Sequence, residues 1–196
     1  MIRCDTTALI LAGGRAQRMA GRDKGLVELN GVPLVQWVVA AIRQQVGDIL
    51  ISANRSLDHY QALGFQVVQD LQTDFPGPLA GVLAGFDVLT TGELLVVPCD
   101  VPLLPRDLVM HMRAKLVGQV ELVIAADPHR IHPAIFLCRA SVRDSLREFV
   151  STGRRQVRAW QSELNTNVCY FDDPVCFTNL NAMDQVDALA ALLNGQ

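Results

Sequence analysis

The sequence predicts a single α/β domain in which helices cover both faces of a mostly parallel central sheet. Short apolar runs alternate along the chain with helical patterns, an order typical of parallel strands joined by helical crossovers. The length of 196 residues fits one domain. Half of the residues are hydrophobic and 19% are charged, which supports a compact core and argues against a disordered chain.

In the first half of the chain, apolar runs predict four buried strands, at residues 8–11, 49–53, 65–68 and 94–97. Three helices are expected between these strands. Pro33 opens the first helix, because its missing N–H is harmless in a first turn. Ser56 is expected to cap the second helix, which Gly64 stops, and the third runs from Pro78 to about Leu89.

The second half of the chain continues the alternation. Pro105 opens a helix that runs to about Val117. The apolar runs 122–126 and 134–137 predict two strands, and the second is a candidate antiparallel strand. The remaining expected elements are helices near 140–151 and 154–164, a strand at 168–171 and a closing helix at 183–193. Because no repeat, low-complexity segment or linker interrupts this order, we expect one domain over residues 1–196.

A parallel sheet with right-handed crossovers places its ligands beyond the carboxyl ends of its strands. This rule selects four candidate stretches, which directly follow the first four predicted strands. They are residues 12–24, residues 52–55, Asp70 and Asp100.

Composition excludes several functional classes. The net charge of −3 and the isoelectric point near 5.7 do not suit a general nucleic-acid binder. No apolar run approaches the roughly 20 residues of a membrane helix, and the first short apolar run ends in glycines, unlike a signal peptide. The five cysteines are odd in number and form no Cys-x-x-Cys pair, so we expect a protein of the reducing cytoplasm.

Basic residues gather in two stretches of this weakly acidic chain. Residues 15–24 carry an excess of three positive charges, and residues 139–158 carry six arginines against Asp144 and Glu148. Each stretch suggests a local anion site. For 139–158 a solvated helix face is an equal alternative, because Arg139, Arg143 and Arg147 recur at helical spacing.

The first predicted strand runs directly into a glycine-rich, basic loop, Leu11-Ala12-Gly13-Gly14, which ends at Asp23-Lys24-Gly25. Gly13 and Gly14 lack a Cβ, so the backbone can approach a ligand closely, and its N–H groups can cradle phosphate. Arg18 and Lys24 add positive charge. The loop matches neither the P-loop nor the dinucleotide-binding pattern. A tight turn with exposed arginines is the alternative interpretation.

The fourth predicted strand ends in one carboxylate between two prolines, in Pro98-Cys99-Asp100-Val101-Pro102. Proline fixes φ and stiffens this turn. A rigid aspartate at the end of a strand suits Mg²⁺, which takes one or two carboxylates and completes its shell with water and phosphate oxygens. The alternative is an aspartate that only caps a helix or a turn. The neighbouring Cys99 is expected to pack in the core.

Together with residues 29–34, the glycine-rich loop resembles nucleotide-sugar-type nucleotidyltransferases. Five further pieces of sequence narrow the resemblance to the molybdenum cofactor guanylyltransferase family. They are residues 23–25, 52–55, 76–81, 98–102 and 179–181. The resemblance extends from about residue 8 to 190 and is most specific in the first half. It implies a Rossmann-like domain of the nucleotide-diphospho-sugar transferase type, with a nucleotide-binding half at about 1–105 and a pterin-binding half at about 106–196.

The resemblance also implies roles for individual residues. The GTP-binding loop would be Leu11, Ala12, Gly13 and Gly14, and the guanine nucleoside would be held by Ser52, Asn54 and Asp70. Lys24 would contact the triphosphate, and Asp100 would bind Mg²⁺ and nucleotide phosphate. Candidates for the pterin side are Arg18, His132, Arg154, Arg155, Asn179 and Asn181. The chain departs from the family pattern at Ala20, where glycine is usual, and at Ser52, where asparagine is frequent.

The implied reaction transfers GMP from GTP to molybdenum-bound molybdopterin and releases diphosphate. The attacking phosphate of the pterin is already ionised at neutral pH, so no covalent enzyme nucleophile is needed. Catalysis would depend on positioning and on charge stabilisation by Mg²⁺ at Asp100, with Lys24 and Arg18 neutralising developing charge. The implied protein is a cytoplasmic monomer with molybdoenzyme chaperones as possible partners and no nucleic acid or membrane.

Two other classes of function stay open. One is the same fold acting on another substrate, as a cytidylyltransferase for the pterin or a sugar- or alditol-phosphate transferase. The other is a non-catalytic carrier of a nucleotide or a pterin. The presence of both Lys24 and Asp100 argues against a carrier. His59 and His111 fall on predicted helices and are expected to be ordinary surface or packing residues.

Overall fold

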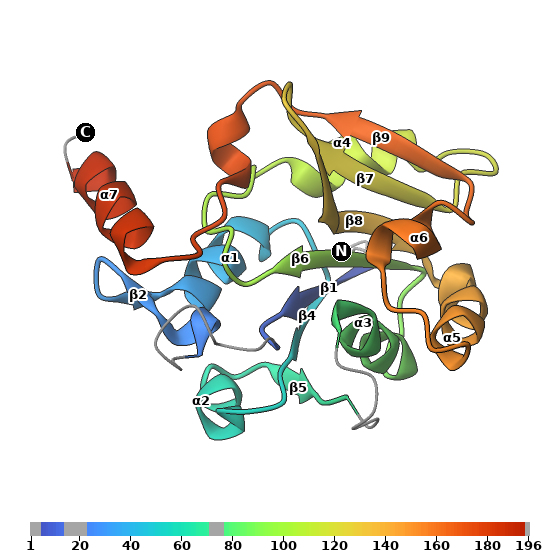
Figure 1. The fold of residues 1–196 in the computed structure, drawn as a ribbon, viewed down its shortest axis with the longest axis horizontal. Coiled ribbons are helices and arrows are strands. Elements are labelled where there is room, and N and C mark those ends of the chain that lie inside the picture. The colour runs from blue at the N-terminus through green and yellow to red at the C-terminus, as the bar shows by residue number, and fades with distance from the viewer. Residues whose placement is uncertain (1–4, 14–22, 71–76, 195–196) are drawn as a thin grey trace.

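The computed structural model describes residues 5–13, 23–70 and 77–194. Its main sheet has seven strands in the order β5-β4-β1-β6-β8-β7-β9 (Figure 1). The strands are β1 (Thr6–Leu11), β4 (Asp48–Ser52), β5 (Gln66–Val68), β6 (Glu93–Pro98), β7 (Leu122–Ala126), β8 (Ile131–Arg139) and β9 (Thr166–Tyr170). Neighbours pair in parallel except that β8 runs antiparallel to both β6 and β7. The predicted mostly parallel sheet and the antiparallel strand near 134–137 are therefore confirmed.

The first face of the sheet is covered by α1 (Leu34–Ile42), α2 (Leu57–Ala62) and α4 (Leu108–Lys115). Side chains of a strand point alternately to the two faces. Ala8 and Ile10 of β1 accordingly pack in one core cluster with Val38 of α1 and Met112 of α4.

The opposite face is covered by α3 (Pro78–Asp87), α5 (Arg143–Ser151) and α6 (Val157–Gln161). Leu9 of β1 packs there with Phe86 of α3, Phe149 of α5 and the buried Trp160 of α6. Helices α3 and α5 lie side by side in Figure 1. Helices on both faces of the sheet agree with the predicted fold class.

A small hairpin that the sequence analysis did not anticipate precedes α1. It consists of β2 (Glu28–Leu29) and β3 (Val32–Pro33). Asn30 and Gly31 form its turn with φ values of 52° and 74°, the conformation in which an Asn-Gly pair joins two short strands. Leu29 packs with Leu180 and with the closing helix α7 (Met183–Asn194) in a separate apolar cluster.

Several predicted helix starts differ from the structure. Pro33 ends the hairpin and flanks α1, which begins at Leu34. Ser56 has a φ of 53° and its side chain makes no capping hydrogen bond, so the expected Ser56 cap is wrong. Helix α4 begins at Leu108 because residues from Pro105 onward first form a turn, in which the Leu108 N–H donates to the Pro105 carbonyl at 3.2 Å. Short 3₁₀ turns η1 (Lys24–Leu26), η2 (Ala140–Val142) and η3 (Pro174–Phe177) complete the described chain.

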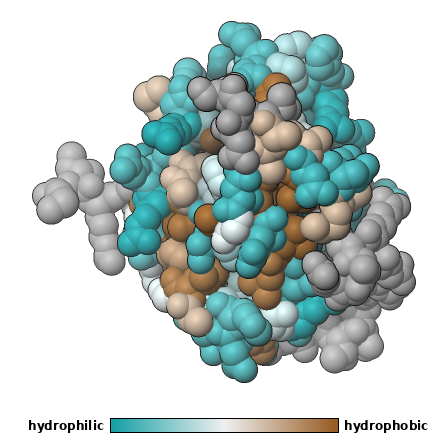
Figure 2. Space-filling model, turned by 90° about the vertical axis from the view of Figure 1, so that its left-hand side faces the viewer, coloured by the Kyte–Doolittle hydropathy of each residue, from teal (hydrophilic) through white to brown (hydrophobic). Residues whose placement is uncertain are grey.

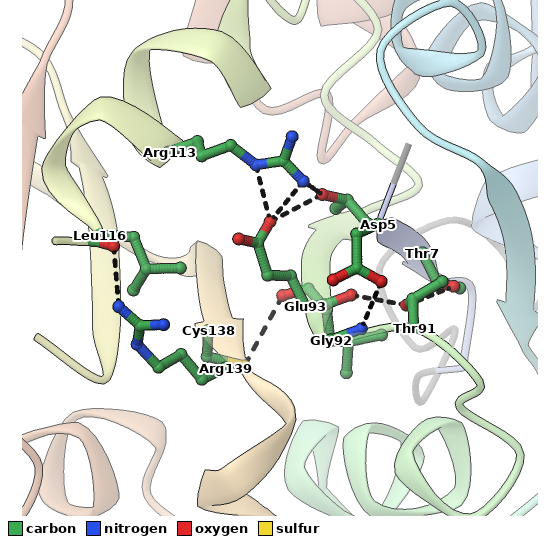
Figure 3. A network of polar contacts seen from close by, with 11 residues as sticks. Asp5, Thr7, Thr91, Gly92, Glu93, Arg113, Leu116, Cys138 and Arg139 are labelled. Carbon is green, nitrogen blue, oxygen red and sulfur yellow. Dashed lines mark hydrogen bonds and ion pairs between the residues drawn. The ribbon is translucent and has the colours of Figure 1, made fainter. Parts of the chain in front are cut away.

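At the edge of the sheet where β1 and β6 begin, polar groups form a network of paired side chains (Figure 3). The guanidinium of Arg113 donates to the carboxylate of Glu93 from Nε at 2.9 Å and from a terminal nitrogen at 2.7 Å. The Thr6 hydroxyl also donates to Glu93, at 2.8 Å, and the Gly92 N–H donates to Asp5 at 2.9 Å. These contacts pair the polar side chains at the end of the sheet where β1 and β6 begin, which we call the N-terminal edge. Within the described part of the chain, no helix is both long enough and apolar enough to cross a membrane.

Candidate functional site

The C-terminal ends of β1, β4 and β6 meet at one edge of the sheet. Leu11 is paired with Ser52 on one side and with Pro98 on the other. Beyond the paired residues, the Ala12 N–H donates to the Ser52 carbonyl at 2.8 Å and the Cys99 N–H donates to the Leu11 carbonyl at 3.1 Å. Gly13 and Asp100 therefore follow neighbouring strands at the same edge.

Figure 2 shows the molecule from the side that lies to the left in Figure 1, toward which β6 runs. Apolar residues gather in the middle of this face, and hydrophilic residues border them. The predicted ligand-binding edge of the sheet opens on this side of the molecule.

An open cleft of about 770 Å³ lies at this edge. Its lining residues are Leu11, Gly13, Ser52, Asn54, Arg55, Asp70, Gly77, Pro78, Gly81 and Arg155. The structure thus brings the residues predicted to hold the nucleoside around one space. Arg155, predicted for the pterin side, lies in the same cleft. Gly14 and Arg18 fall outside the described residues.

Helix α3 approaches the floor of the cleft very closely. A Cβ on Gly81 would lie 2.3 Å from Oγ and 3.3 Å from Cβ of the buried Ser52. Glycine at position 81 therefore lets α3 lie directly on β4. The helix starts at Pro78, and both Pro78 and the preceding Gly77 line the cleft, so the positive end of the helix dipole lies beside it.

Asn54 and Asp70 form a mutual pair on the wall of the cleft. The amide of Asn54 donates to Oδ2 of Asp70 at 2.8 Å, and its oxygen accepts from the Asp70 N–H at 3.0 Å. Oδ1 of Asp70 is buried without a hydrogen-bond partner among the described residues. The pair thus fixes a carboxylate that has one unpaired acceptor oxygen.

Lys24 lies at the start of η1, and its ammonium group has three acceptors from distant parts of the chain. It contacts Oδ2 of Asp100 and donates to the amide oxygens of Asn181 at 2.7 Å and Asn179 at 3.2 Å. An ammonium group carries three donors, so these acceptors satisfy it fully. The structure therefore places Asn179 and Asn181, predicted for the pterin side, beside the predicted catalytic pair.

Asp23 anchors the turn that carries Lys24. Its Oδ1 accepts from the Tyr60 hydroxyl at 2.6 Å and from the Gly25 N–H at 3.3 Å, and its Oδ2 lies 4.0 Å from Nε of Arg55. Burial, and then the hydrogen bond to Asp23, raises the pKa of Tyr60, so its hydroxyl stays a donor. Sequence reasoning missed both roles, because Asp23 and Tyr60 meet only in the folded chain.

One carboxylate oxygen of Asp100 has a partner, and the other is unpaired. Oδ2 contacts Lys24, whereas Oδ1 is buried with no hydrogen-bond partner among the described residues. No group of three His, Cys, Asp or Glu side chains suited to a metal occurs in the described ranges. A single carboxylate with an open oxygen fits Mg²⁺, which would take its other ligands from water and phosphate.

Cys99, next to Asp100, packs in the core cluster under α1 and α4, as predicted. Burial, followed by the charge of Asp100, raises the pKa of the Cys99 thiol. A buried thiol that stays protonated cannot serve as a nucleophile at neutral pH.

The basic stretch 139–158 is mostly engaged in structural contacts. Arg143 and Arg147 both donate to Asp87 of α3, at 2.6 Å and 2.9 Å, and Arg139 donates to the Val120 carbonyl at 2.9 Å. Arg154 pairs with Glu163 and stacks over the ring of Phe149 at 4.0 Å. The helix-face interpretation is therefore correct for Arg143 and Arg147 of α5 but wrong for Arg139, which ends strand β8. Among the site candidates in this stretch, only Arg155 reaches the cleft.

The remaining candidate of the pterin side, His132, lies at the start of β8. Its Nε2 is 2.7 Å from Oδ2 of Asp127, and its ring stacks on Phe177. His111, which was expected to be an ordinary residue, pairs with Asp107 on the exposed side of α4.

With this geometry established, similarity to known proteins becomes informative. The family of MobA-like NTP transferase domains matches residues 8–167. A molybdenum cofactor guanylyltransferase of Shewanella sp. strain MR-4 is 43% identical over 189 residues, which cover 95% of this chain and 96% of the relative. The protein of the same name from Shewanella baltica strain OS185 is 44% identical over 185 residues, or 93% of this chain and 94% of the relative.

A solved structure shares the fold. The crystal structure of molybdopterin-guanine dinucleotide biosynthesis protein A from Archaeoglobus fulgidus matches with a TM-score of 0.76 and 20% identity. The match covers 97% of this chain and 100% of the other. The overall fold therefore recurs in a distant solved protein.

Proposed function

The chain belongs to the family of MobA-like NTP transferase domains, and on that premise we propose that it transfers GMP from GTP to molybdenum-bound molybdopterin. Diphosphate is the leaving group. The observation that carries the proposal is the convergence at one sheet edge of a nucleoside-sized cleft and the Lys24–Asp100 pair. The relatives that share nearly the whole chain are named for this activity.

The guanine nucleoside binds in the cleft between β1, β4 and the start of α3. Gly13 gives the ligand close access to the backbone, and Gly81 lets α3 lie on β4 where the two elements form the floor of the cleft. The guanine base presents N–H donors, which a carboxylate or a backbone carbonyl can accept. Oδ1 of Asp70, held in place by Asn54, is such an acceptor on the cleft wall.

The triphosphate extends from the cleft toward Lys24 and Asp100. When bound, Mg²⁺ supplies charge neutralisation for the phosphates and polarises the phosphorus that is attacked. Asp100 would hold the ion through its open Oδ1. Lys24 is anchored by Asn179 and Asn181, so it can give up its contact with Asp100 and donate to a phosphate oxygen without losing its position.

The acceptor phosphate attacks the α-phosphorus directly. Its oxygen forms the new P–O bond while the bond to the β-phosphate oxygen breaks, and the electron pair leaves with diphosphate. An ionised phosphate needs no covalent enzyme intermediate, in agreement with the protonated Cys99. The chain's residues therefore act by alignment and by electrostatic stabilisation.

The acceptor approaches from the second half of the chain. Arg155 reaches the cleft from that half and supplies positive charge near the phosphates. Arg18 remains a predicted contributor to charge neutralisation. Cytoplasmic location, a monomeric state and contact with molybdoenzyme chaperones likewise remain predictions for this chain.

Turnover with GTP and with CTP, measured side by side with Mg²⁺ and the molybdenum-bound pterin, tests the proposal. We expect diphosphate release with GTP and little with CTP. A preference for CTP would make the chain a cytidylyltransferase. Binding of GTP and the pterin without diphosphate release would instead support the carrier.

A further inference from the structure

The second half of the chain contains a buried histidine–aspartate pair that the proposed reaction does not use. His132 is 9% exposed and Asp127 is 4% exposed. Nε2 of His132 lies 2.7 Å from Oδ2 of Asp127. Buried ionisable groups are uncommon unless they are paired, and pairs of this kind gather at functional sites.

Asp127 is held rigidly and stays ionised. Its Oδ1 accepts from the backbone N–H groups of His129 at 2.7 Å and Arg130 at 2.9 Å. Burial alone would raise the pKa of Asp127, but these hydrogen bonds and the contact with His132 outweigh burial and lower it. An ionised carboxylate requires a donor, so Nε2 of His132 carries the proton and the ring orientation is fixed.

A shift in the pairing of β7 with β8 determines the position of His132. The register between β7 and β8 shifts between Ile124 and Ala125, and His132 then pairs with Ala125. The buried side chain of Gln161 donates to the Pro133 carbonyl at 2.9 Å and supports the shifted segment. Register shifts of this kind re-aim side chains beside active sites.

The fixed imidazole ring stacks on Phe177. The ring centroids are 4.7 Å apart and the planes differ by 23°. Phe177 is 1% exposed and ends the turn η3, which Asp173 caps by accepting from the Val175 N–H at 2.9 Å. Phe171 packs edge-on against Phe177, with 5.3 Å between the ring centroids. Two aromatic contacts therefore set the position of Phe177.

The chain leads from Phe177 directly to the catalytic centre. Only Thr178 and Asn179 separate it from Leu180, whose N–H donates to the Asp100 carbonyl at 2.9 Å. The amide oxygens of Asn179 and Asn181 flank Leu180 and accept from Lys24. The segment 178–181 is thus stretched between the His132–Phe177 stack and the backbone of Asp100.

We propose that Asp127 and His132 are positioning residues for Lys24. Through the stack with Phe177 they set segment 178–181, so that Asn179 and Asn181 hold the lysine in place for a phosphate. The inference rests on the proposed function insofar as Lys24 contacts the triphosphate. It gives His132 a structural route to catalysis that requires no contact with the acceptor.

A double-mutant cycle tests this route. His132→Ala is introduced into the wild type and into an Asn179→Ala/Asn181→Ala background, and kcat/KM for GTP is measured in all four proteins. In the wild type we expect a loss of roughly tenfold, the scale of coupling between residues that share one network. Without the asparagines the same substitution is expected to cost less than about twofold, because its route to Lys24 is already broken.

Equal losses in both backgrounds would overturn the proposal, because His132 would then act on the acceptor or on stability alone. A loss confined to KM for the pterin would point to direct acceptor contact and would also overturn it. Phe177→Leu, which removes the stacked ring and keeps the apolar volume, is expected to reproduce the pattern and serves as the second variant if His132→Ala does not fold.

His59→Ala is the control variant. His59 lies exposed on α2 and is none of the rings that contact Phe177. We expect its kcat/KM to equal that of the wild type. The same four proteins are also compared by their dissociation constants for magnesium-bound GTP, which measures the coupling between His132 and the asparagines without turnover. A wild type that binds GTP but transfers no GMP would refute the proposed reaction. The binding measurements would then decide this inference by themselves.

Discussion

Carboxylates at the two ends of the central sheet's strands differ in how their oxygens are paired. At the N-terminal edge, Glu93 accepts three hydrogen bonds, from Arg113 twice and from Thr6 (Figure 3). At the C-terminal edge, Asp100, Asp70 and Asp23 each keep one carboxylate oxygen without a hydrogen-bond partner among the described residues. These account for three of the six such buried atoms in the described chain.

This contrast separates a structural network from a binding site. Folded proteins satisfy nearly all buried polar groups, and each exception calls for an explanation. Glu93 shows that this chain can direct three donors at a single carboxylate oxygen where only stability is at stake. We infer that the open oxygens at the opposite edge are kept for ligands, with Asp100 for a metal and Asp70 for a base.

The largest expected effect is at Asp100. Asp100→Ala removes the proposed metal ligand and should lower kcat by roughly 10²–10³-fold or more, the scale of a lost electrostatic stabiliser. Steady-state diphosphate release over a range of Mg²⁺ concentrations measures it. The substitution also removes the contact of Oδ2 with Lys24, but Lys24 keeps Asn179 and Asn181 as acceptors, so the loss of stability should be small. A variant that keeps near-normal Mg²⁺-dependent rates would show that Asp100 is not the metal ligand.

Lys24→Ala should weaken GTP use by roughly 1–3 kcal/mol in kcat/KM, the range of a charge-assisted hydrogen bond. The substitution also removes the cation that contacts Asp100 in the nucleotide-free protein. Binding of Mn²⁺ alone, followed by electron paramagnetic resonance, should therefore become tighter while GTP binding becomes weaker. If both affinities fell together, Lys24 would not be competing with the metal for Asp100.

A substitution at Gly25 tests whether the turn η1 holds Lys24 in place. A Cβ at this position would lie 2.5 Å from the Tyr60 hydroxyl, which is fixed by Asp23. Gly25→Ala should therefore displace the turn and reduce kcat/KM by an amount that corresponds to about 1–3 kcal/mol of overpacking. Adding Tyr60→Phe removes the clashing oxygen and should restore part of the loss. A double variant no better than Gly25→Ala would contradict this explanation.

The smallest effect on activity is expected at the opposite edge. Glu93→Gln weakens the hydrogen bonds from Arg113 and should cost about 1 kcal/mol of unfolding free energy, since the guanidinium is partly exposed. Chemical denaturation measures this cost. The kcat of the folded variant should equal that of the wild type. A substantial fall in kcat would show that the two edges are not separate in function.

Local patterns were sufficient to predict most of the fold. The strand 122–126 was predicted with the bounds of β7, because five buried apolar residues in a row leave little ambiguity. The hairpin at residues 28–33 was missed, since strands of two residues show no periodicity. Asn30 and Gly31 were the available signal, as this dipeptide is typical of tight hairpin turns.

The candidate site was predictable where its residues directly follow strands, as Gly13 and Asp100 do. Contacts between distant residues were not. Lys24 meets Asn181 across 157 positions, and Tyr60 meets Asp23 across 37. The sequence marks each of these residues as polar but does not show which partner the fold brings to it. The ion pairs of Arg143 and Arg147 with Asp87 could not be predicted for the same reason.

The central claim is that the cleft and the Lys24–Asp100 centre share a single nucleotide. The crystal structure of the protein with GTP and Mg²⁺ tests it most directly. The account predicts electron density for guanine beside Asp70 and Gly81, with the triphosphate running to Lys24 and a metal ion on Asp100. A nucleotide bound in the cleft whose phosphates point away from Lys24 and Asp100 would contradict it.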